Sequence, residues 1–347
     1  MSSPAQSQGK PEASNRLLSD EQIEEIFRLD VEPRLARHAS QDAPRVVLLG
    51  GPQGSRKTTL RSLVAEQLGL EDALIYEGDD HFPLHPHFDG LMREHGLLAA
   101  ADACKADLDV LQGLFLEEVR AQRLNIMFVG PYTDQEYTLS RLATFREDGY
   151  QSDLAYTALH PALTHVGVMD RHRRAVSEGP GDSFLVSVEL QQMIYDGVPA
   201  IMTVAEDRDL ADGLHVVDAA GVAYSKHRGA DGHWTPQRPL REVVEEVRHR
   251  PWDTDTREDY LARRAAVETP VGESPTAWGA RLRHLDSLAA PMLGDGAGPG
   301  RVSAQAARRR STTLPPGAQK KPSPSPRRPG VPPPHAPGAS SSSGHGR

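Results

Sequence analysis

A strand, a glycine-rich loop and a helix follow one another directly in this sequence, and no other feature constrains the fold as strongly. Residues 45–49 form a short, almost continuous apolar run, as expected for a strand buried on both faces. The loop at residues 50–56 follows, and apolar residues then recur at helical spacing until Gly69, a typical helix-ending residue. A strand that leads through such a loop into a helix is the building unit of an α/β fold.

The loop also carries a chemical pattern. Residues 51–58, Gly-Pro-Gln-Gly-Ser-Arg-Lys-Thr, match GxxxxGK[ST] at the first glycine, the lysine and the hydroxyl residue. In this motif backbone N–H groups converge on phosphate oxygens at a helix N-terminus, the lysine reaches the outer phosphates and the hydroxyl faces a magnesium ion. We therefore predict that ATP and Mg²⁺ bind here, with Thr58 on the metal. The predicted nucleotide-binding residues are Gly51, Pro52, Gln53, Gly54, Ser55, Arg56, Lys57, Thr58 and Thr59.

Arg56 departs from the motif, because it stands where a second glycine is usual. Glycine at this position lets the backbone approach the phosphates and adopts angles that a Cβ atom resists. An arginine either strains and crowds the loop, or adds a guanidinium that pairs with phosphate. The sequence leaves both alternatives open.

The rest of the chain alternates strands and helices. Apolar runs predict strands at residues 73–76, 124–129 and 154–159, and helical periodicity is found at residues 20–37, 57–68, 100–122, 135–148, 161–176 and 186–205. The fold class expected is α/β, a P-loop kinase-like parallel sheet with helices on both faces. A strand pair at 214–217 and 222–226 and charged helices at 240–247 and 257–267 complete the pattern.

Composition bounds the class of partner. Residues 296–347 contain nine Lys or Arg and no Asp or Glu, so residues 1–295 hold 30 basic and 48 acidic side chains. This acidic body argues against nucleic-acid binding by the folded part, and the Pro/Ser/Gly-rich tail is expected to be disordered. Cys104 is the single cysteine, and neither a signal peptide nor a membrane-length apolar run is apparent. We expect a cytoplasmic protein without membrane contact.

Two segments together resemble one family. Residues 48–60, LLGGPQGSRKTTL, and residues 75–88, IYEGDDHFPLHPHF, are similar to the phosphate loop and the following acidic segment of the zeta-toxin family, the kinases of bacterial toxin–antitoxin systems. The similarity continues through residues 124–134 and 154–174 and covers about half of the chain. It implies phosphorylation of a sugar hydroxyl of UDP-N-acetylglucosamine, or a related nucleotide sugar, by ATP and Mg²⁺. It also implies an antitoxin protein as a partner.

The resemblance assigns roles to individual residues. Lys57 matches the family's phosphate-loop lysine and Thr58 its magnesium-side hydroxyl, while Asp79 falls at the position of the catalytic base. The end of a parallel strand suits such a base, because ligands bind beyond the carboxyl ends of the strands. Arg171 aligns with an arginine that acts on the transferring phosphate, with Arg174 one turn further on the same helix face.

Several positions depart from the family pattern. His81-Phe82 replaces a pair that carries a basic residue, Val129 stands where the family has a glutamate, and Phe184 aligns with a second catalytic arginine. Asp134 is the nearest acid that could substitute for the glutamate. The histidines after Asp79 also suggest a metal cluster, but the prolines among them and the lack of further ligands at regular spacing argue against one.

The predicted organisation has four parts. A disordered leader at residues 1–18 precedes a zeta-toxin-like P-loop kinase domain at 19–228, a helical C-terminal extension at 229–292 and the basic tail at 293–347. Three alternatives to a nucleotide-sugar kinase stay open. They are a catalytically impaired nucleotide-binding pseudokinase, another small-molecule P-loop kinase acting on an antibiotic or a nucleoside, and a structural or interaction protein.

Overall fold

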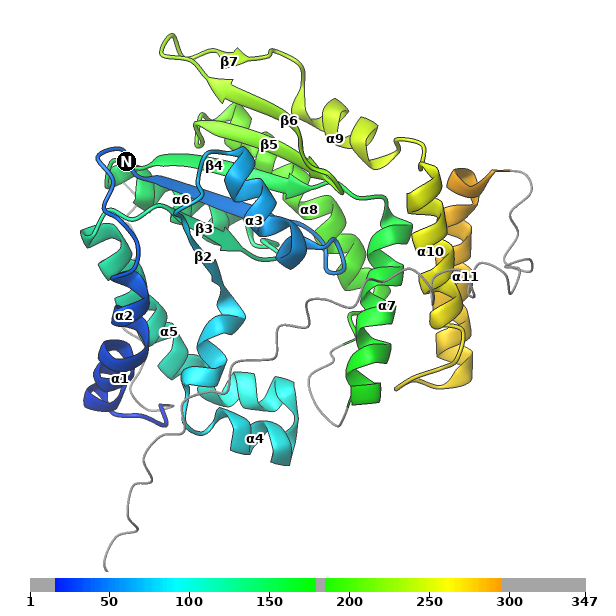
Figure 1. The fold of residues 1–347 in the computed structure, drawn as a ribbon, viewed down its shortest axis with the longest axis horizontal. Coiled ribbons are helices and arrows are strands. Elements are labelled where there is room, and N and C mark those ends of the chain that lie inside the picture. Colours follow the sequence, from blue (N-terminus) through cyan, green and yellow to red (C-terminus); the bar gives the residue numbers. More distant parts are fainter. Residues whose placement is uncertain (1–15, 179–184, 295–347) are drawn as a thin grey trace, which may run out of the picture. The chain divides into compact units, whose positions relative to one another are not determined.

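The computed structural model describes residues 16–178 and 185–294, and these contain a seven-stranded sheet with helices on both faces (Figure 1). The strands are β1 (Arg45–Gly50), β2 (Leu74–Glu77), β3 (Ile126–Val129), β4 (Gln151–Thr157), β5 (Gly213–Asp218), β6 (Gly221–Arg228) and β7 (Trp234–Thr235). Their order in the sheet is β2-β3-β1-β4-β5-β6-β7. The first five strands pair in parallel, and β6 and β7 are antiparallel additions at one edge. The predicted α/β class with a parallel sheet is confirmed.

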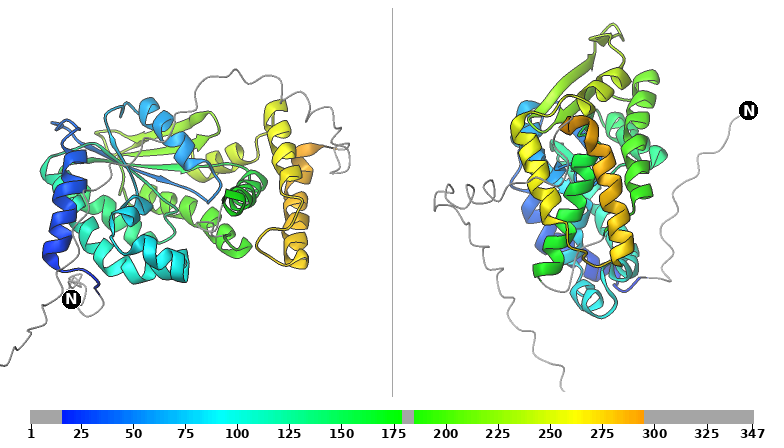
Figure 2. Two further views of the ribbon diagram at one scale, coloured as in Figure 1. Left: turned by 60° about the horizontal axis from the view of Figure 1, so that its bottom comes forward. Right: turned by 90° about the vertical axis from the view of Figure 1, so that its right-hand side faces the viewer.

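Helices precede the first strand, connect the parallel strands and follow the last strand. They are α1 (Asp20–Ile26), the π-helix η2 (Phe27–Val31), α2 (Glu32–Leu35), α3 (Lys57–Gln67), the 3₁₀ helix η3 (Gly78–Leu84), α4 (Phe88–His95), α5 (Leu97–Ala121), α6 (Gln135–Glu147), α7 (Pro161–Glu178), α8 (Val188–Asp207), α9 (Leu240–Arg248), α10 (Thr254–Ala266) and α11 (Pro275–Leu293). Figure 2 shows from two further directions how these helices cover the sheet.

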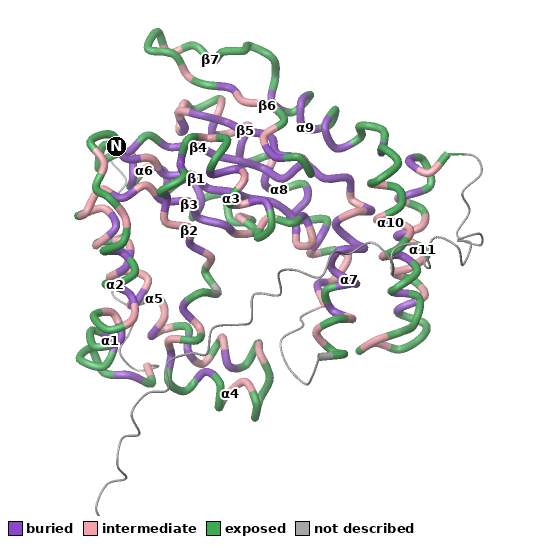
Figure 3. Tube along the Cα trace, in the orientation of Figure 1, coloured by how far each residue is buried: buried purple, intermediate pink, exposed green. Residues whose placement is uncertain are grey.

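The central strand β1 explains the two main cores, because its side chains alternate between the faces of the sheet. Val46 and Leu48 join the larger core with residues from α5, α6 and α8, whereas Val47 and Leu49 join a smaller one with residues from α3. All four side chains are fully buried, as the apolar run at residues 45–49 predicts. The buried residues of the sheet stand out in Figure 3.

A third core lies between α7 and the C-terminal helices. Ala162 and Val166 of α7 pack with Tyr260 of α10 and with Trp278 and Leu285 of α11. The three helices lie side by side (Figures 1 and 2). This packing holds α10 next to the helix that follows β4, and so brings the C-terminal extension close to the phosphate loop.

Two predicted elements differ from the observed ones for identifiable reasons. The helix expected at 20–37 is divided by the π-helical turn η2, because Pro33 has no backbone N–H for the next α-helical hydrogen bond. The strand expected at 154–159 begins three residues earlier, at Gln151. Its buried polar residues concealed this start from the apolar pattern: Asp153 pairs with Arg45, and Ser152 contacts Asp212.

Several further segments complete the comparison with the predicted elements. The 3₁₀ helix η3 and helix α4 lie between residues 78 and 95, where no helix was predicted, and α11 lies within the predicted helical extension. Residues 16–18, in the predicted leader, contact the buried carboxylate of Asp107, which accepts from Arg16 Nε and from the backbone N–H groups of Leu17 and Leu18. Most of the leader and of the tail lies outside the described residues.

Candidate nucleotide and acceptor site

The loop between β1 and α3 has the geometry of a phosphate-binding loop. Gly51 and Gly54 have positive φ values of 150° and 77°, and α3 begins at Lys57. Ser55 is fully buried, and its hydroxyl lies 2.6 Å from the Thr157 hydroxyl at the end of β4. The loop is therefore tied to the carboxyl edge of the sheet, where ligands of parallel sheets bind.

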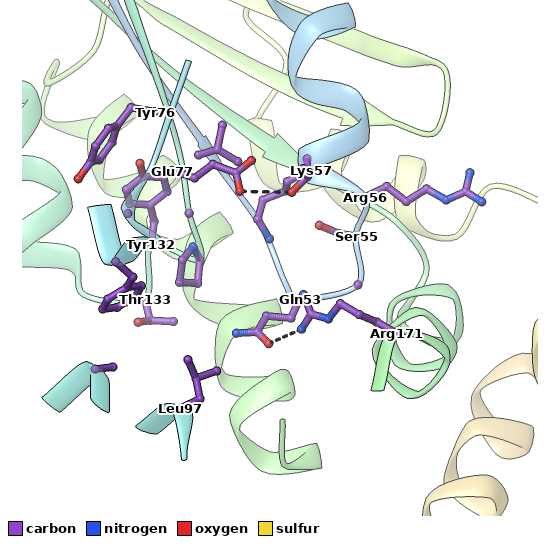
Figure 4. A pocket seen from close by; sticks show the side chains of 18 of the residues that line it. Gln53, Ser55, Arg56, Lys57, Tyr76, Glu77, Leu97, Tyr132, Thr133 and Arg171 are labelled. Carbon is purple, nitrogen blue, oxygen red and sulfur yellow. Dashed lines mark hydrogen bonds between the residues drawn. The ribbon is translucent and has the colours of Figure 1, made fainter. Parts of the chain in front are cut away.

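Close contact with α7 fixes the other side of the loop. A Cβ atom on Gly54 would lie 2.2 Å from the carbonyl oxygen of Thr164, and one on Gly167 would lie 2.8 Å from the carbonyl oxygen of Gly54. Only glycine permits this approach of loop and helix at both positions. On the same helix Arg171 donates to Gln53 Oε1 at 3.3 Å, so the predicted phosphate-contacting arginine stands beside the loop (Figure 4).

Lys57 lies over the loop. Its ammonium donates to the carbonyl oxygens of Gly51 at 2.7 Å and Pro52 at 2.9 Å. Burial is the main cause that lowers the pKa of Lys57 to about 7, the Arg171 guanidinium adds to this, and Glu77 opposes it. Bound phosphates would replace the two carbonyl acceptors and favour the charged ammonium, as expected for a lysine that serves an anion site.

Thr58 occupies the position predicted for the magnesium side. Its hydroxyl donates to Glu77 Oε2 at 3.4 Å, and Glu77 also accepts from Arg61 at 2.5 Å. A hydroxyl and a carboxylate at the mouth of a phosphate loop are hard oxygen donors of the kind that Mg²⁺ prefers alongside phosphate oxygens. The residues present therefore fit the ion. Glu77 was not among the predicted site residues, although its place at the end of β2 was the available signal.

The structure shows where the side chain of Arg56 lies, which the sequence left open. It caps α3 in the left-handed region, with φ 65° and ψ 19°. Its side chain is directed away from Lys57 and pairs at 2.9 Å with Asp259, a residue of α10 (Figure 4). The Arg56 guanidinium therefore does not crowd the part of the loop around Lys57 where phosphate is expected to bind.

A cavity of about 1170 Å³ extends from the loop across the carboxyl edge of the sheet. Around the phosphate loop the lining is basic, with Arg56, Lys57, Arg171, Arg174 and Arg263. The other side, from β2 to α5, is largely apolar, with Tyr76, Phe82, Phe88, Met92 and Leu97. This volume exceeds the range of roughly 300–1,000 Å³ that is typical of one small-molecule pocket. The cavity can accommodate an anionic ligand and a second molecule beside it.

Two arginines that line the cavity, Arg141 and Arg263, were not among the residues predicted for the site. Arg141 of α6 lies with its guanidinium carbon 4.7 Å from the Phe128 ring centre and 4.6 Å from that of Tyr137. It offers a positive charge that the His81-Phe82 pair does not provide. Arg263 comes from α10, more than 200 residues after the loop, and no local pattern could have placed it there.

The acidic segment after β2 is only partly described. The backbone of Asp79 lies in η3, two residues beyond Glu77, which ends β2, while its side chain lies outside the described part of the structure. The role of Asp79 as base stays a prediction. Asp80 accepts from the backbone N–H of Glu77 at 3.1 Å and so caps η3.

The neighbouring histidines are engaged in packing and hydrogen bonding. His81 is buried against Tyr76 and Phe115, and burial lowers its pKa to about 4. His85 Nε2 lies 3.1 Å from Asp107 Oδ2, and its Nδ1 lies 3.3 Å from Cys104 Sγ. Over residues 16–178 and 185–294, no group of three or more His, Cys, Asp or Glu side chains is arranged to hold a metal ion.

The departures from the family pattern have different positions. Val129 is buried at the end of β3 and borders the cavity. Asp134 also lines the cavity, but its Oδ1 caps α6 by accepting from the Tyr137 N–H at 2.9 Å. Phe184 lies outside the described residues.

Within the described part of the chain, no helix is both long and apolar enough to cross a membrane.

Comparison with known proteins identifies relatives of this arrangement. The family model described as zeta toxin matches residues 32–228. Toxin zeta of Streptococcus pyogenes is 18% identical over 204 residues, which cover 59% of this chain and 70% of that protein. Toxin zeta of Streptococcus agalactiae is 19% identical over 207 residues, with the same coverage. A solved structure from the PezAT chromosomal toxin–antitoxin system of Streptococcus pneumoniae has a TM-score of 0.58 at 16% identity, covering 77% of this chain and 97% of that one.

Proposed function

Because the chain belongs to the zeta-toxin family, we propose that it is an ATP-dependent phosphotransferase that phosphorylates a sugar hydroxyl of UDP-N-acetylglucosamine or a related nucleotide sugar. Family membership supports a P-loop kinase-like phosphotransferase, and the identity of the acceptor is the finer part of the proposal. The observation that carries it is one cavity that joins two kinds of surface. Lys57, Thr58 and Arg171 line it at the phosphate loop, and apolar residues from β2 to α5 line the rest.

In this proposal the nucleotide phosphates lie on the loop. Backbone N–H groups of the loop and the start of α3 favour negative charge there. Lys57 leaves its two carbonyl acceptors to contact the outer phosphates, and Arg171 offsets charge that develops on the transferring phosphoryl group. Thr58 and Glu77 would hold the magnesium ion, which supplies neutralisation of phosphate charge when it is bound.

The acceptor would lie against the apolar wall of the cavity. Phe82, which is half-buried, offers aromatic surface for a base or a sugar, and Arg141 offers a positive charge for its phosphates. The attacking sugar oxygen forms a bond to the γ-phosphorus while the bond to the ADP oxygen breaks. Asp79 would take the hydroxyl proton, a role worth about 10²–10⁴ in rate. Its backbone position directly after β2 is consistent with that role.

The direct test is turnover by the purified full-length chain. ATP, Mg²⁺ and UDP-N-acetylglucosamine together should yield ADP and a phosphorylated nucleotide sugar, detected by mass spectrometry. Lys57→Ala should abolish product formation. Product from an antibiotic or a nucleoside but not from the nucleotide sugar would favour another small-molecule P-loop kinase.

A catalytically impaired nucleotide-binding protein is the second candidate, and Val129 is the observation that favours it. A buried valine there replaces the family's acid at the edge of the acceptor space. Tight ATP binding without ADP formation on any nucleotide sugar would establish this alternative. Absence of ATP binding would refute both candidates.

We also propose an antitoxin protein as partner. The support is membership of the zeta-toxin family and the similar structure from the PezAT toxin–antitoxin system. Expression in a bacterial host should arrest growth, and Lys57→Ala should relieve the arrest. Rescue by co-expression of a reading frame adjoining the gene would identify the partner, and unchanged growth on expression of the unmodified chain would argue against a toxin.

A further inference from the structure

Helix α10 contributes to the wall of the nucleotide cavity although it lies outside the family match. The match ends at residue 228, whereas α10 spans Thr254–Ala266. Its residue Arg263 lines the same cavity as Lys57, Arg171 and Arg174. Tyr260 on the same helix is buried in the core shared with α7, so the backbone that carries Arg263 is held by packing.

One edge of the Arg263 guanidinium is anchored. Its Nε lies 3.0 Å from Asp259 Oδ2, one helical turn earlier, and the same oxygen lies 2.9 Å from Nη2 of Arg56 in the phosphate loop. Asp259 therefore joins α10 directly to the loop. In residues 16–178 and 185–294, no acceptor contacts the two Nη atoms of Arg263.

The charges around the cavity indicate what these atoms can bind. Asp259 is shared by two arginines, so it does not neutralise both of them. Arg171 and Arg174 of the neighbouring α7 add positive charge to the same cavity. Arg174 pairs at 3.0 Å with Asp170, whereas Arg171 has only an amide oxygen, Gln53 Oε1, as its hydrogen-bond acceptor among the described residues. A ligand with several anionic oxygens would satisfy these donors together, and guanidinium groups bind phosphate oxygens in paired, charge-assisted hydrogen bonds.

We propose that Arg263 is a phosphate-binding residue, through which α10 supplies a guanidinium to the polyphosphate of the nucleotide. This inference rests on the proposed function, because it requires a nucleoside triphosphate in the cavity. It extends the site to a helix beyond the family-matched region. A chain that ends before α10 would lack this contact and also the ion pair that anchors Arg56.

Nucleotide binding by the full-length chain tests the inference without any requirement for turnover. Isothermal titration with ATP and Mg²⁺ would compare the unmodified protein with Arg263→Gln, which removes the charge, and Arg263→Lys, which keeps it. Loss of a charge-assisted hydrogen bond should weaken ATP binding about tenfold in Arg263→Gln. Arg263→Lys should recover only part of this loss, because its charge persists but its ammonium cannot form the paired hydrogen bonds of a guanidinium.

The matched control is Arg257→Gln, an exposed arginine on the same helix that does not line the cavity. Its ATP affinity should be unchanged, as should the affinity of Arg263→Gln for adenosine, which carries no phosphate. Equal ATP affinity in Arg263→Gln and the unmodified protein would overturn the inference and leave the proposed function standing. If the unmodified protein binds no ATP, the proposed function fails and the inference fails with it.

Discussion

The left-handed conformation of Arg56 predicts an unusual order of stability among variants at that position. For an L-residue the left-handed helical region costs roughly 1–2 kcal/mol, and glycine avoids this cost. Glycine loses about 0.4–1 kcal/mol of that advantage, because its unfolded state has more conformational freedom. Arg56→Gly should therefore be more stable than Arg56→Ala by about 0.5–1 kcal/mol.

The comparison of these two variants isolates the backbone contribution. Both variants lose the ion pair between Arg56 and Asp259, so this loss cancels in the comparison. The two side chains are 38% and 36% exposed, and such a pair contributes roughly 0.2–1 kcal/mol. Each 1 kcal/mol shifts the melting temperature by about 2–4 °C in a folded domain of 150–250 residues. Thermal unfolding of the full-length chain should show Arg56→Gly melting about 1–4 °C above Arg56→Ala.

Ser62 supplies the matched control, because it is exposed in the right-handed helix α3 that Arg56 caps. There the order should reverse, with Ser62→Ala more stable than Ser62→Gly by about 1 kcal/mol. If alanine equals or exceeds glycine at position 56 as well, residue 56 is not left-handed and our account of the loop is wrong.

Three further predictions concern the site. Burial and Arg171 lower the pKa of Lys57 to about 7, so the free lysine is mostly charged below pH 7 and mostly neutral above it. Bound phosphates raise this pKa again, and ATP binding should therefore weaken as pH rises above 7 and take up close to one proton at pH 8.5 but little at pH 6. Calorimetry in buffers of different ionisation enthalpy measures this uptake, and equal uptake at both values would contradict it. Asp79→Asn should lower kcat by about 10²–10⁴ with little change in ATP affinity. The control is Asp80→Asn, which keeps an oxygen acceptor for the cap of η3 and should retain most activity. If Asp79→Asn loses ATP affinity by as large a factor as kcat, a role as base is excluded. Arg171→Ala should reduce kcat by about 10³ or more. Arg173→Ala serves as control, because Arg173 lies on the same helix but pairs with Asp170 outside the cavity. A similar kcat in the two variants would show that Arg171 does not act on the phosphate.

Local sequence was sufficient for the elements that the backbone and its apolar periodicity specify. The apolar run before Gly51 becomes β1, because a strand covered on both faces needs apolar side chains in succession. The loop and the start of α3 follow from the spacing of Gly51, Lys57 and Thr58. The same local reading missed the start of β4, because Asp153 is buried with a partner, Arg45, that is 108 residues distant.

Part of the candidate site was also within reach of the sequence. Lys57 and Arg171 lie at the loop, as their motif and the resemblance predict, because the phosphate loop and the helix after β4 meet at the carboxyl edge of any such sheet. Glu77 could have been recognised from its place at the end of a strand. Arg141 could not, since its contact with the cavity depends on the rotation of α6 against the sheet.

The sequence by itself determined that this chain has a phosphate loop and that Arg56 breaks the pattern of the loop. Only the tertiary structure decided what that break means. Arg56 turns outward because Asp259, 203 residues later, is held beside it by the packing of α10 on α7. The same packing brings Arg263 into the cavity. Local patterns report hydrogen bonding and periodicity over a few residues, whereas the direction of a long charged side chain depends on which distant partner the fold supplies.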